Sequence, residues 1–158
     1  MDKFIKENST DNVIKLNKAL EQSLHDVDKE IIIRLDKSIP LINDIGKHLI
    51  KASGKRLRPL LTLAMAAQFN DYSKNPKILA AAVEFIHTAT LLHDDVVDES
   101  KMRRSMQSIN SKFGNSIAVL VGDFIYSKSF QIMATLNSNN IVRILSNCTN
   151  KIAEGEVL

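Results

Sequence analysis

The stretch "PKILAAAVEFIHTATLLHDDVVDE", residues 76–99, decides the fold of this chain. It opens with Pro76, which suits the first turn of a helix because that turn leaves its backbone N–H groups unpaired. Alanine, leucine and isoleucine follow without a glycine or a second proline. The spacing therefore predicts one helix over 76–98, about 34 Å long at 1.5 Å per residue.

Four carboxylates, Asp94, Asp95, Asp98 and Glu99, stand at the end of this helix, where the backbone dipole disfavours negative charge. Asp94 and Asp98 lie four residues apart on one face and repel each other, and Asp95 lies about a quarter-turn around. A solvated acidic helix end would explain the pattern. A binding site for Mg²⁺ would also explain it, because Mg²⁺ takes one or two carboxylates and completes its coordination shell with water and phosphate.

The rest of the chain has the same helical character, and neither strand-like alternation nor an internal repeat is found. Its 158 residues, with 44% hydrophobic content, five glycines and three prolines, favour an all-α fold in one domain, 1–158. Segment 100–115 is expected to be a loop with one short helical turn. The other expected helices are 10–35, 39–52, 59–69, 116–136 and 141–158.

Composition limits the classes of function. The net charge of +3 and the pI near 9.0 suit anionic ligands but do not indicate nucleic acid, since no clustered basic helix or aromatic stacking positions accompany them. Cys148 is the single cysteine, which favours a reducing compartment. Neither a secretory signal nor a run of 18 apolar residues is found, so we expect a cytoplasmic protein without an integral membrane segment.

Basic residues flank the acidic helix in the sequence. The stretch "GKRLRP", residues 54–59, places Lys55, Arg56 and Arg58 before a helix that starts with proline. Backbone donors at a helix N-terminus and arginine side chains together form a phosphate site. Three charges in a row are also ordinary solvated surface, so this stretch alone leaves both readings open.

An arginine pair, Arg103 and Arg104, follows the aspartates within one short loop, where simple charge compensation would explain it. His87 lies two helical turns before Asp94 and near the same face, although an isolated histidine on an apolar helix is more often a core residue. Taken together, a metal seat between two sets of cations indicates a site that holds diphosphates and stabilises one as it leaves.

These motifs occur in a recognisable order: "GKRLRP", "AAVEFIHTATLLHDDVVDES", "RR", "FGN", "AVLVGDFIYSKSF" and "AEGEVL". In order and spacing the chain resembles the trans-isoprenyl diphosphate synthases, most closely the long-chain, octaprenyl-type polyprenyl diphosphate synthases that make quinone side chains. The resemblance runs from about residue 10 to the last residue. It implies an isoprenoid-synthase-type helical bundle, and a homodimer.

The resemblance also implies roles for side chains. Asp94 and Asp98 match the aspartates that ligate Mg²⁺, with Asp95 supporting them, and Arg103 matches the arginine that binds the allylic diphosphate. The residues that match those holding isopentenyl diphosphate are Lys55, Arg58, His87 and Arg104. The implied reaction is head-to-tail condensation, in which diphosphate leaves the allylic substrate, the allylic cation alkylates isopentenyl diphosphate, and a proton is lost.

Two small residues bear on product length. Family members that stop at short products have bulky aromatics near the position of Ala89, five residues before Asp94. Here Ala89 and Thr90 are small, which the resemblance associates with a long chain. The alternative is that a small residue merely lets two helices approach.

The chain also departs from the family pattern. Ser53 replaces a glycine before "GKR", and Ser105, Gln107 and Ser108 replace a glycine, a proline and a threonine after the arginine pair. We expect this loop to be looser as a result. The second aspartate-rich motif of the family is absent from the sequence, so we expect an incomplete bundle, the N-terminal portion of a synthase.

Two functions remain open at this stage. The first is prenyl transfer, for which activity of this chain alone is in doubt, with peripheral membrane contact for product release. The second is a non-catalytic partner that binds diphosphate or associates with a second synthase chain.

Overall fold

The structure is a computed structural model that describes residues 14, 18–35, 39–51 and 54–157. The helices are α2 (Glu21–Leu35), α3 (Pro40–Lys51), α4 (Leu57–Gln68), α5 (Asn75–Val97), α6 (Ile109–Phe113), α7 (Asn115–Ala134) and α8 (Asn139–Val157). Two short strands, β1 (Met102–Arg103) and β2 (Met106–Gln107), form an antiparallel hairpin. The fold is therefore all-α apart from this hairpin, as the sequence predicts. Residues 10–13 and 15–17 of the first expected helix, and Ser53, lie outside the described residues.

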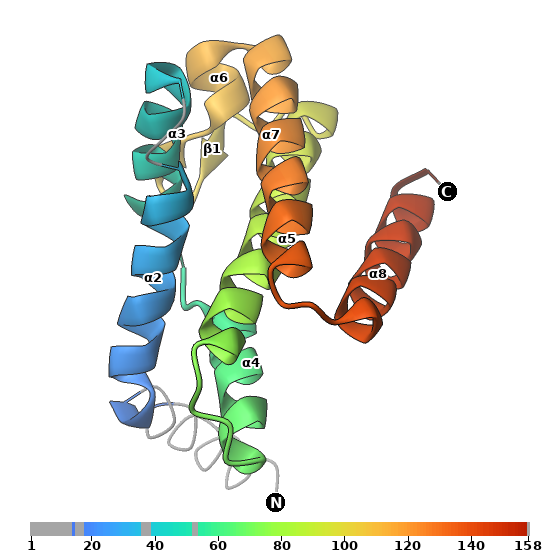
Figure 1. Cartoon of the computed structure of the whole chain (residues 1–158). Helices are drawn as coiled ribbons and strands as arrows, with labels where there is room; N and C mark the ends of the chain where they lie inside the picture. The colour runs from blue at the N-terminus through green and yellow to red at the C-terminus, as the bar shows by residue number, and fades with distance from the viewer. Residues whose placement is uncertain (1–13, 15–17, 36–38, 52–53, 158) are drawn as a thin grey trace, which may run out of the picture.

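Helix α5 lies in the middle of the bundle, with α7 packed along one side and α2 and α4 on the other (Figure 1). Pro76 stands in its first turn, as predicted. The helix contributes Ala80, Ala81, Ala82 and Ala89 to the core, all without solvent exposure. Because an alanine side chain ends at Cβ, these positions allow the neighbouring helices to approach the α5 backbone closely.

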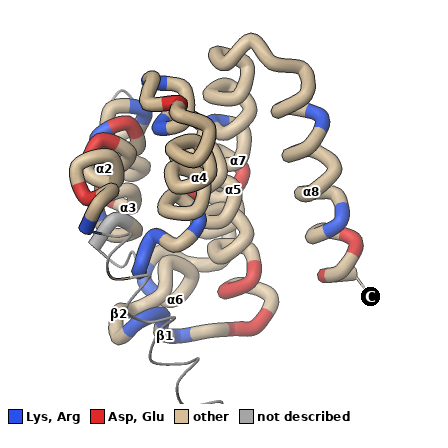
Figure 2. The backbone as a smooth tube through the Cα atoms, turned by 90° about the horizontal axis from the view of Figure 1, so that it is seen from below, with Lys and Arg blue, Asp and Glu red and all other residues tan. Residues whose placement is uncertain are grey.

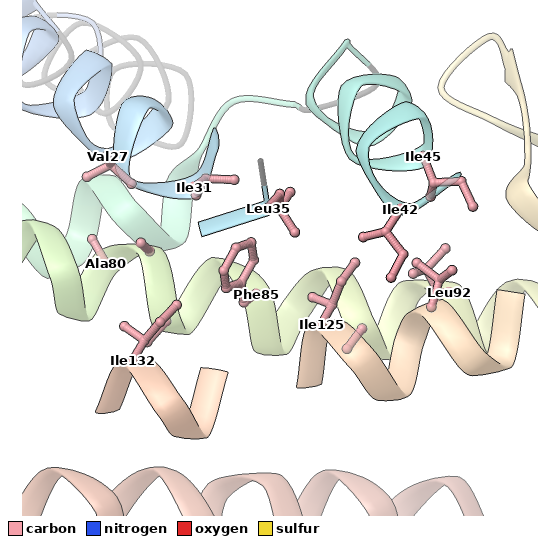
Figure 3. Packing of buried hydrophobic residues seen from close by; sticks show 14 of the residues in the cluster. Val27, Ile31, Leu35, Ile42, Ile45, Ala80, Phe85, Leu92, Ile125 and Ile132 are labelled. Carbon is pink, nitrogen blue, oxygen red and sulfur yellow. The ribbon is translucent and has the colours of Figure 1, made fainter. Parts of the chain in front are cut away.

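Larger side chains fill the space between the helices (Figure 3). Phe85 of α5 is 2% exposed and is enclosed by aliphatic residues from α2, α3 and α7. Burying a side chain of this size contributes about 1.5–3 kcal/mol relative to leaving it in water. The aliphatic members labelled in the figure are Val27, Ile31, Leu35, Ile42, Ile45, Leu92, Ile125 and Ile132.

Among the described residues, α7 is the one helix long and apolar enough, by length and composition, to cross a membrane. Its apolar run is interrupted by Asp123 and Lys128. Val121, Ile125 and Ile132 are buried, and α7 makes the most extensive helix contact in the bundle with α5. These contacts explain the apolar composition of α7, which is that of a core helix.

Helix α8 lies beside the bundle, with its main contact on α7 (Figure 1). Two cavities separate it from the central helices. One, of about 390 Å³, lies between α8 and α5, and another, of about 460 Å³, is lined by α4, α5 and α8. The α8 residues that line them recur at helical spacing: Ile141, Leu145, Cys148, Thr149 and Ile152.

Candidate diphosphate and metal site

The three aspartates at the end of α5 differ in how deeply they are buried. Asp95 is buried, at 3% exposure, whereas Asp94 is partly buried and Asp98 is exposed. Helical spacing predicts this division, since Asp94 and Asp98 share a face and Asp95 lies about a quarter-turn away. The helix ends at Val97, and the backbone N–H of Asp98 still bonds to the carbonyl of Asp94 at 2.8 Å.

Arg103 of the β1–β2 hairpin binds the buried Asp95 through two nitrogens. Its Nε donates to both carboxylate oxygens, at 2.8 and 2.9 Å, and its Nη2 donates to Oδ1 at 2.6 Å. The hydrogen bonds and charge of Asp95 raise the pKa of Arg103, so the guanidinium stays protonated. Figure 2 shows the acidic end of α5 and the basic hairpin at the same end of the molecule.

The hairpin turn is Arg104-Ser105, and both residues have positive φ, 49° and 64°. This is the signature of a type I′ turn, which matches the twist of two paired strands. The sequence prediction of a loop over 100–115 is therefore wrong at 102–107, although its short helical turn is found as α6. Ser105 occupies a left-handed position that glycine adopts without steric cost.

The hairpin is fixed by contacts on both sides. Ser108 donates its hydroxyl to the carbonyl of Ser100 at 2.6 Å, and Asn110 donates to the carbonyl of Asp95 at 2.8 Å. A ring nitrogen of His48, on α3, lies 2.9 Å from the carbonyl of Gln107. These bonds hold the hairpin against α3 and the end of α5. The expectation of a looser loop stays a prediction.

Asp94 lies in a negative environment. Burial raises its pKa, and the carboxylates of Glu156, Asp98 and Asp95 raise it further, while Arg103 acts in the opposite direction. In the described part of the chain, no side-chain hydrogen bond or ion pair is formed by the carboxylates of Asp94 and Asp98. A cation would relieve this repulsion.

The donor set at the end of α5 fits Mg²⁺ rather than a metal bound by protein alone. Among the described residues, no three His, Cys, Asp or Glu side chains come close enough together to hold an ion. Asp94 and Asp98 are two hard oxygen donors, and Mg²⁺ commonly takes one or two carboxylates and leaves the remaining positions to water and substrate phosphates. Asp95 is committed to Arg103 and is not part of this donor set.

The four residues that the sequence connects with isopentenyl diphosphate line one cavity of about 400 Å³. They come from the loop before α4, from the first turn of α4, from α5 and from the hairpin: Lys55, Arg58, His87 and Arg104. Gly54 completes the wall, and a Cβ at this position would collide with the guanidinium of Arg104. The cavity therefore gathers basic groups from segments that are far apart in the sequence.

His87 is partly buried in this cavity. Burial lowers its pKa, and the charges of Arg58, Arg104 and Arg103 lower it further, while Glu84 acts in the opposite direction. Around neutral pH, His87 is therefore a neutral imidazole that faces cationic neighbours. An anion placed among these groups would offset their positive charges and raise the pKa of the His87 imidazole.

Arg56, in contrast, is a structural residue. Its guanidinium pairs with Glu84 of α5 at 2.7 Å and with Asp28 of α2 at 2.9 Å. Its backbone is left-handed, with φ 50°, at the residue that precedes α4. This contact holds the Lys55–Arg58 segment against α5. Sequence reasoning missed both partners, and the one available signal was a glutamate within the otherwise apolar stretch before His87.

The structure places the two small residues near the aspartates in different surroundings. Ala89 is fully buried in the core cluster, whereas Thr90 lines the cavity between α5 and α8 together with His87 and Asp94. That cavity is mostly apolar, with Val83, Ile86 and Leu91 from α5. The polar end near Asp94 thus continues into an apolar space along the same face of α5.

Comparison with solved structures defines the class of the protein. The chain superposes on a polyprenyl synthase from Caulobacter crescentus CB15, complexed with calcium and isoprenyl diphosphate, with a TM-score of 0.88 and 43% identity, over 92% of this chain and 44% of that one. A decaprenyl diphosphate synthase from Rhodobacter capsulatus gives 0.85 and 44% identity, over 92% and 45%. The fold is that of the isoprenoid synthases, of which it covers about half.

Sequence comparison gives the family. The polyprenyl synthetase model matches residues 39–158, so the chain belongs to the polyprenyl synthetase family. The octaprenyl diphosphate synthase of Escherichia coli (strain K12) is 46% identical over 148 residues, which are 93% of this chain and 46% of that protein. The chain spans about half the length of the curated relatives that it matches. The family and fold predicted from the sequence are confirmed.

Proposed function

We propose that this chain takes part in the synthesis of a long-chain polyprenyl diphosphate, a quinone side-chain precursor, by condensing isopentenyl diphosphate with an allylic diphosphate. The observation that carries the proposal is the single basic cavity formed by Lys55, Arg58, His87 and Arg104 beside Asp94. Two anion sites and an acidic metal seat are what a reaction between two diphosphates requires.

The basic cavity is the proposed site for isopentenyl diphosphate. Lys55 and Arg58 supply cationic donors, and a diphosphate there neutralises the charges that surround His87. The allylic diphosphate is placed near Arg103, between the hairpin and the end of α5. Asp94 and Asp98 are the proposed Mg²⁺ ligands. Bound Mg²⁺ supplies charge neutralisation of the leaving diphosphate.

The apolar cavity between α5 and α8 is the proposed path of the prenyl chain. Its mostly apolar walls disfavour water next to a reactive allylic cation, which water would otherwise hydrolyse. The small side chain of Thr90 leaves this space open near Asp94, and Ala89 lets the core close behind it. Relatives named as octaprenyl and decaprenyl diphosphate synthases support a long product.

A turnover assay tests the proposal. Purified chain is incubated with Mg²⁺, labelled isopentenyl diphosphate and an allylic starter, and the extracted products are counted and sized. Turnover that Asp94→Asn abolishes would support catalysis by this chain. The absence of turnover at high protein concentration would reject a self-sufficient enzyme. Binding of isopentenyl diphosphate, measured separately, tests the basic cavity whatever the turnover.

One observation favours the second candidate function, a subunit that works with another copy or with a second synthase chain. The outer face of α4 carries four exposed apolar side chains at every fourth residue, between 47% and 76% exposed: Leu57, Leu61, Met65 and Phe69. An exposed apolar ridge of this kind commonly marks an interaction surface. Sedimentation of the wild-type chain and of a Leu61→Lys variant tests this, since a monomeric wild type would reject self-association.

The proposed setting is the cytoplasm, with peripheral contact with a membrane when the apolar product is released. The homology to prenyltransferases supports this setting. Co-sedimentation of the chain with lipid vesicles, with and without a polyprenyl diphosphate, tests the peripheral contact.

A further inference from the structure

Asp95 differs from its two neighbouring aspartates in every contact that it makes. Its carboxylate is buried and accepts from Nε and Nη2 of Arg103, while its backbone carbonyl accepts from the side chain of Asn110 and from the backbone N–H of Ser100. One residue of α5 thus holds the hairpin and the loop on either side of it. A carboxylate engaged in this way is less available to a metal ion than the carboxylates of Asp94 and Asp98, which make no such contact within the described residues.

The contact with Asp95 also determines the orientation of the Arg103 guanidinium and which of its N–H groups remain for a ligand. Because Nε and one N–H of Nη2 are bonded to Asp95, the two N–H groups of Nη1 and the second N–H of Nη2 remain for a ligand. The bidentate contact fixes the plane of the guanidinium, which a single bond would leave free to rotate. The neighbouring Arg104 is directed separately, against Gly54. The two arginines therefore serve different places although they are adjacent in the sequence.

We propose that Asp95 is a positioning residue: it acts on the diphosphate through Arg103, whose guanidinium it holds so that Nη1 meets a diphosphate oxygen. This inference rests on the proposed function, since it assumes that a diphosphate binds beside the hairpin. It gives the middle aspartate of the motif a role distinct from metal binding by Asp94 and Asp98.

Two effects of Asp95 on anion binding have opposite signs. Its negative charge repels a nearby diphosphate, so removing that charge would by itself strengthen binding. Ordering a rotamer-rich side chain such as Arg103 in advance strengthens binding, by roughly three- to tenfold. If positioning is the larger effect, Asp95→Asn weakens the binding of diphosphate; if bare charge is the larger effect, the same substitution tightens it.

A double-mutant cycle separates these effects. Inorganic pyrophosphate is titrated calorimetrically, in the presence of Mg²⁺, into the wild-type chain, Asp95→Asn, Arg103→Lys and the double variant. Arg103→Lys keeps the charge but cannot form the bidentate contact. We expect each single variant to lose roughly three- to tenfold in affinity and the double variant to lose no more than either single variant. Asp26→Asn, which breaks an ion pair with Lys77 at the opposite end of α5, should bind as the wild type does.

The outcomes are distinguishable. Additive losses in the double variant, or tighter binding by Asp95→Asn, overturn the positioning role while leaving the proposed function intact. If the wild-type chain does not bind pyrophosphate, the proposed function fails and this inference fails with it. Thermal unfolding of each variant is recorded in parallel. If Asp95→Asn does not fold, the comparison of Arg103→Lys with Asp26→Asn decides, and equal affinities for these two variants overturn the inference.

Discussion

Gly54 lies directly beneath the guanidinium of Arg104, so close that a Cβ at Gly54 would overlap the nitrogen atoms of that side chain. The contact joins the loop before α4 to the tip of the hairpin, segments that are separated by α5. It explains why a glycine stands at this position although its φ is not left-handed. It also makes the placement of Arg104 testable without changing Arg104 itself.

Gly54→Ala is expected to displace Arg104 and to weaken pyrophosphate binding by about 1.5–3 kcal/mol, which is the range for one hydrogen bond to a charged group. The fold should tolerate the change, because the atoms in the way belong to the end of a flexible side chain. Calorimetric titration measures the affinity, and thermal unfolding measures the stability. Gly155→Ala, where a Cβ meets nothing, is the matched control. Unchanged affinity in Gly54→Ala would contradict the assigned place of Arg104.

Binding of a diphosphate should be coupled to proton uptake by His87. In the free protein, burial and the cations Arg58, Arg104 and Arg103 hold the pKa of His87 below 6.5. An anion among these cations raises that pKa, so affinity is expected to increase as the pH falls from about 7.5 towards 6. Titrations in two buffers of different ionisation enthalpy count the protons. His87→Gln provides the baseline, and equal proton uptake in this variant would refute the coupling.

The same histidine affects folding stability in the opposite direction. A folded pKa below the unfolded value of 6.5 means that the unfolded chain binds the proton first as the pH falls. The His87 contribution to stability is therefore complete above pH 6.5 and is lost as the pH falls through the depressed folded pKa. Urea unfolding of the wild type and of His87→Gln between pH 7.5 and 5 measures the difference. A wild type that loses no more stability than the variant would contradict this sign.

Ser105→Gly is expected to stabilise the protein by about 0.5–1 kcal/mol. Ser105 has φ 64° at the tip of the hairpin, a conformation that costs a non-glycine residue about 1–2 kcal/mol, while glycine loses part of this gain through its larger freedom in the unfolded chain. Chemical unfolding measures the change. Ser111→Gly, an exposed position within α6, should instead destabilise by about 0.5–1 kcal/mol. A loss of stability in Ser105→Gly would show that the left-handed turn is not strained.

Glu84→Gln is expected to destabilise the fold by about 2–4 kcal/mol, since it leaves the partly buried Arg56 with one weaker partner. The exposed pair Lys29–Asp26 offers a comparison, and Lys29→Ala should change stability by less than about 0.5 kcal/mol. Urea unfolding provides both values. Similar effects in the two variants would mean that the Arg56–Glu84 contact behaves as a surface ion pair.

Sequence reasoning was most successful where the deciding signal is local. Pro76, the apolar spacing and the terminal acids place α5 within a residue or two of its observed bounds, because helical periodicity depends on neighbours three and four residues away. The same spacing separates Asp95 from Asp94 and Asp98. The short hairpin was missed because two-residue strands show no alternation, and Arg104-Ser105 lacks the Asn-Gly signal of a type I′ turn.

Contacts between distant residues were beyond such reasoning. Arg56 and Glu84 are 28 residues apart, and nothing in either segment distinguishes Arg56 from Lys55 or Arg58. All three line the cavity, and only the folded arrangement shows that Arg56 is the one paired with Glu84 and Asp28. The pairing of Asp95 with Arg103 is similar, because a sequence shows that acids and bases are near each other but does not show which pairs form.

The position of α8 has a consequence for how ligands of different bulk are accepted. One wall of the apolar space belongs to α5, which is anchored on several sides, and the facing wall belongs to α8, whose main contact is α7. The short connection 135–138 between α7 and α8, with Asn137 in a left-handed conformation, sets the separation of the two walls. Under the proposed function, the width of this space and the chemistry of its charged end are specified by different parts of the chain. Substitutions in the four residues 135–138 would then change the bulk that is accepted without changing the residues proposed to meet the diphosphate.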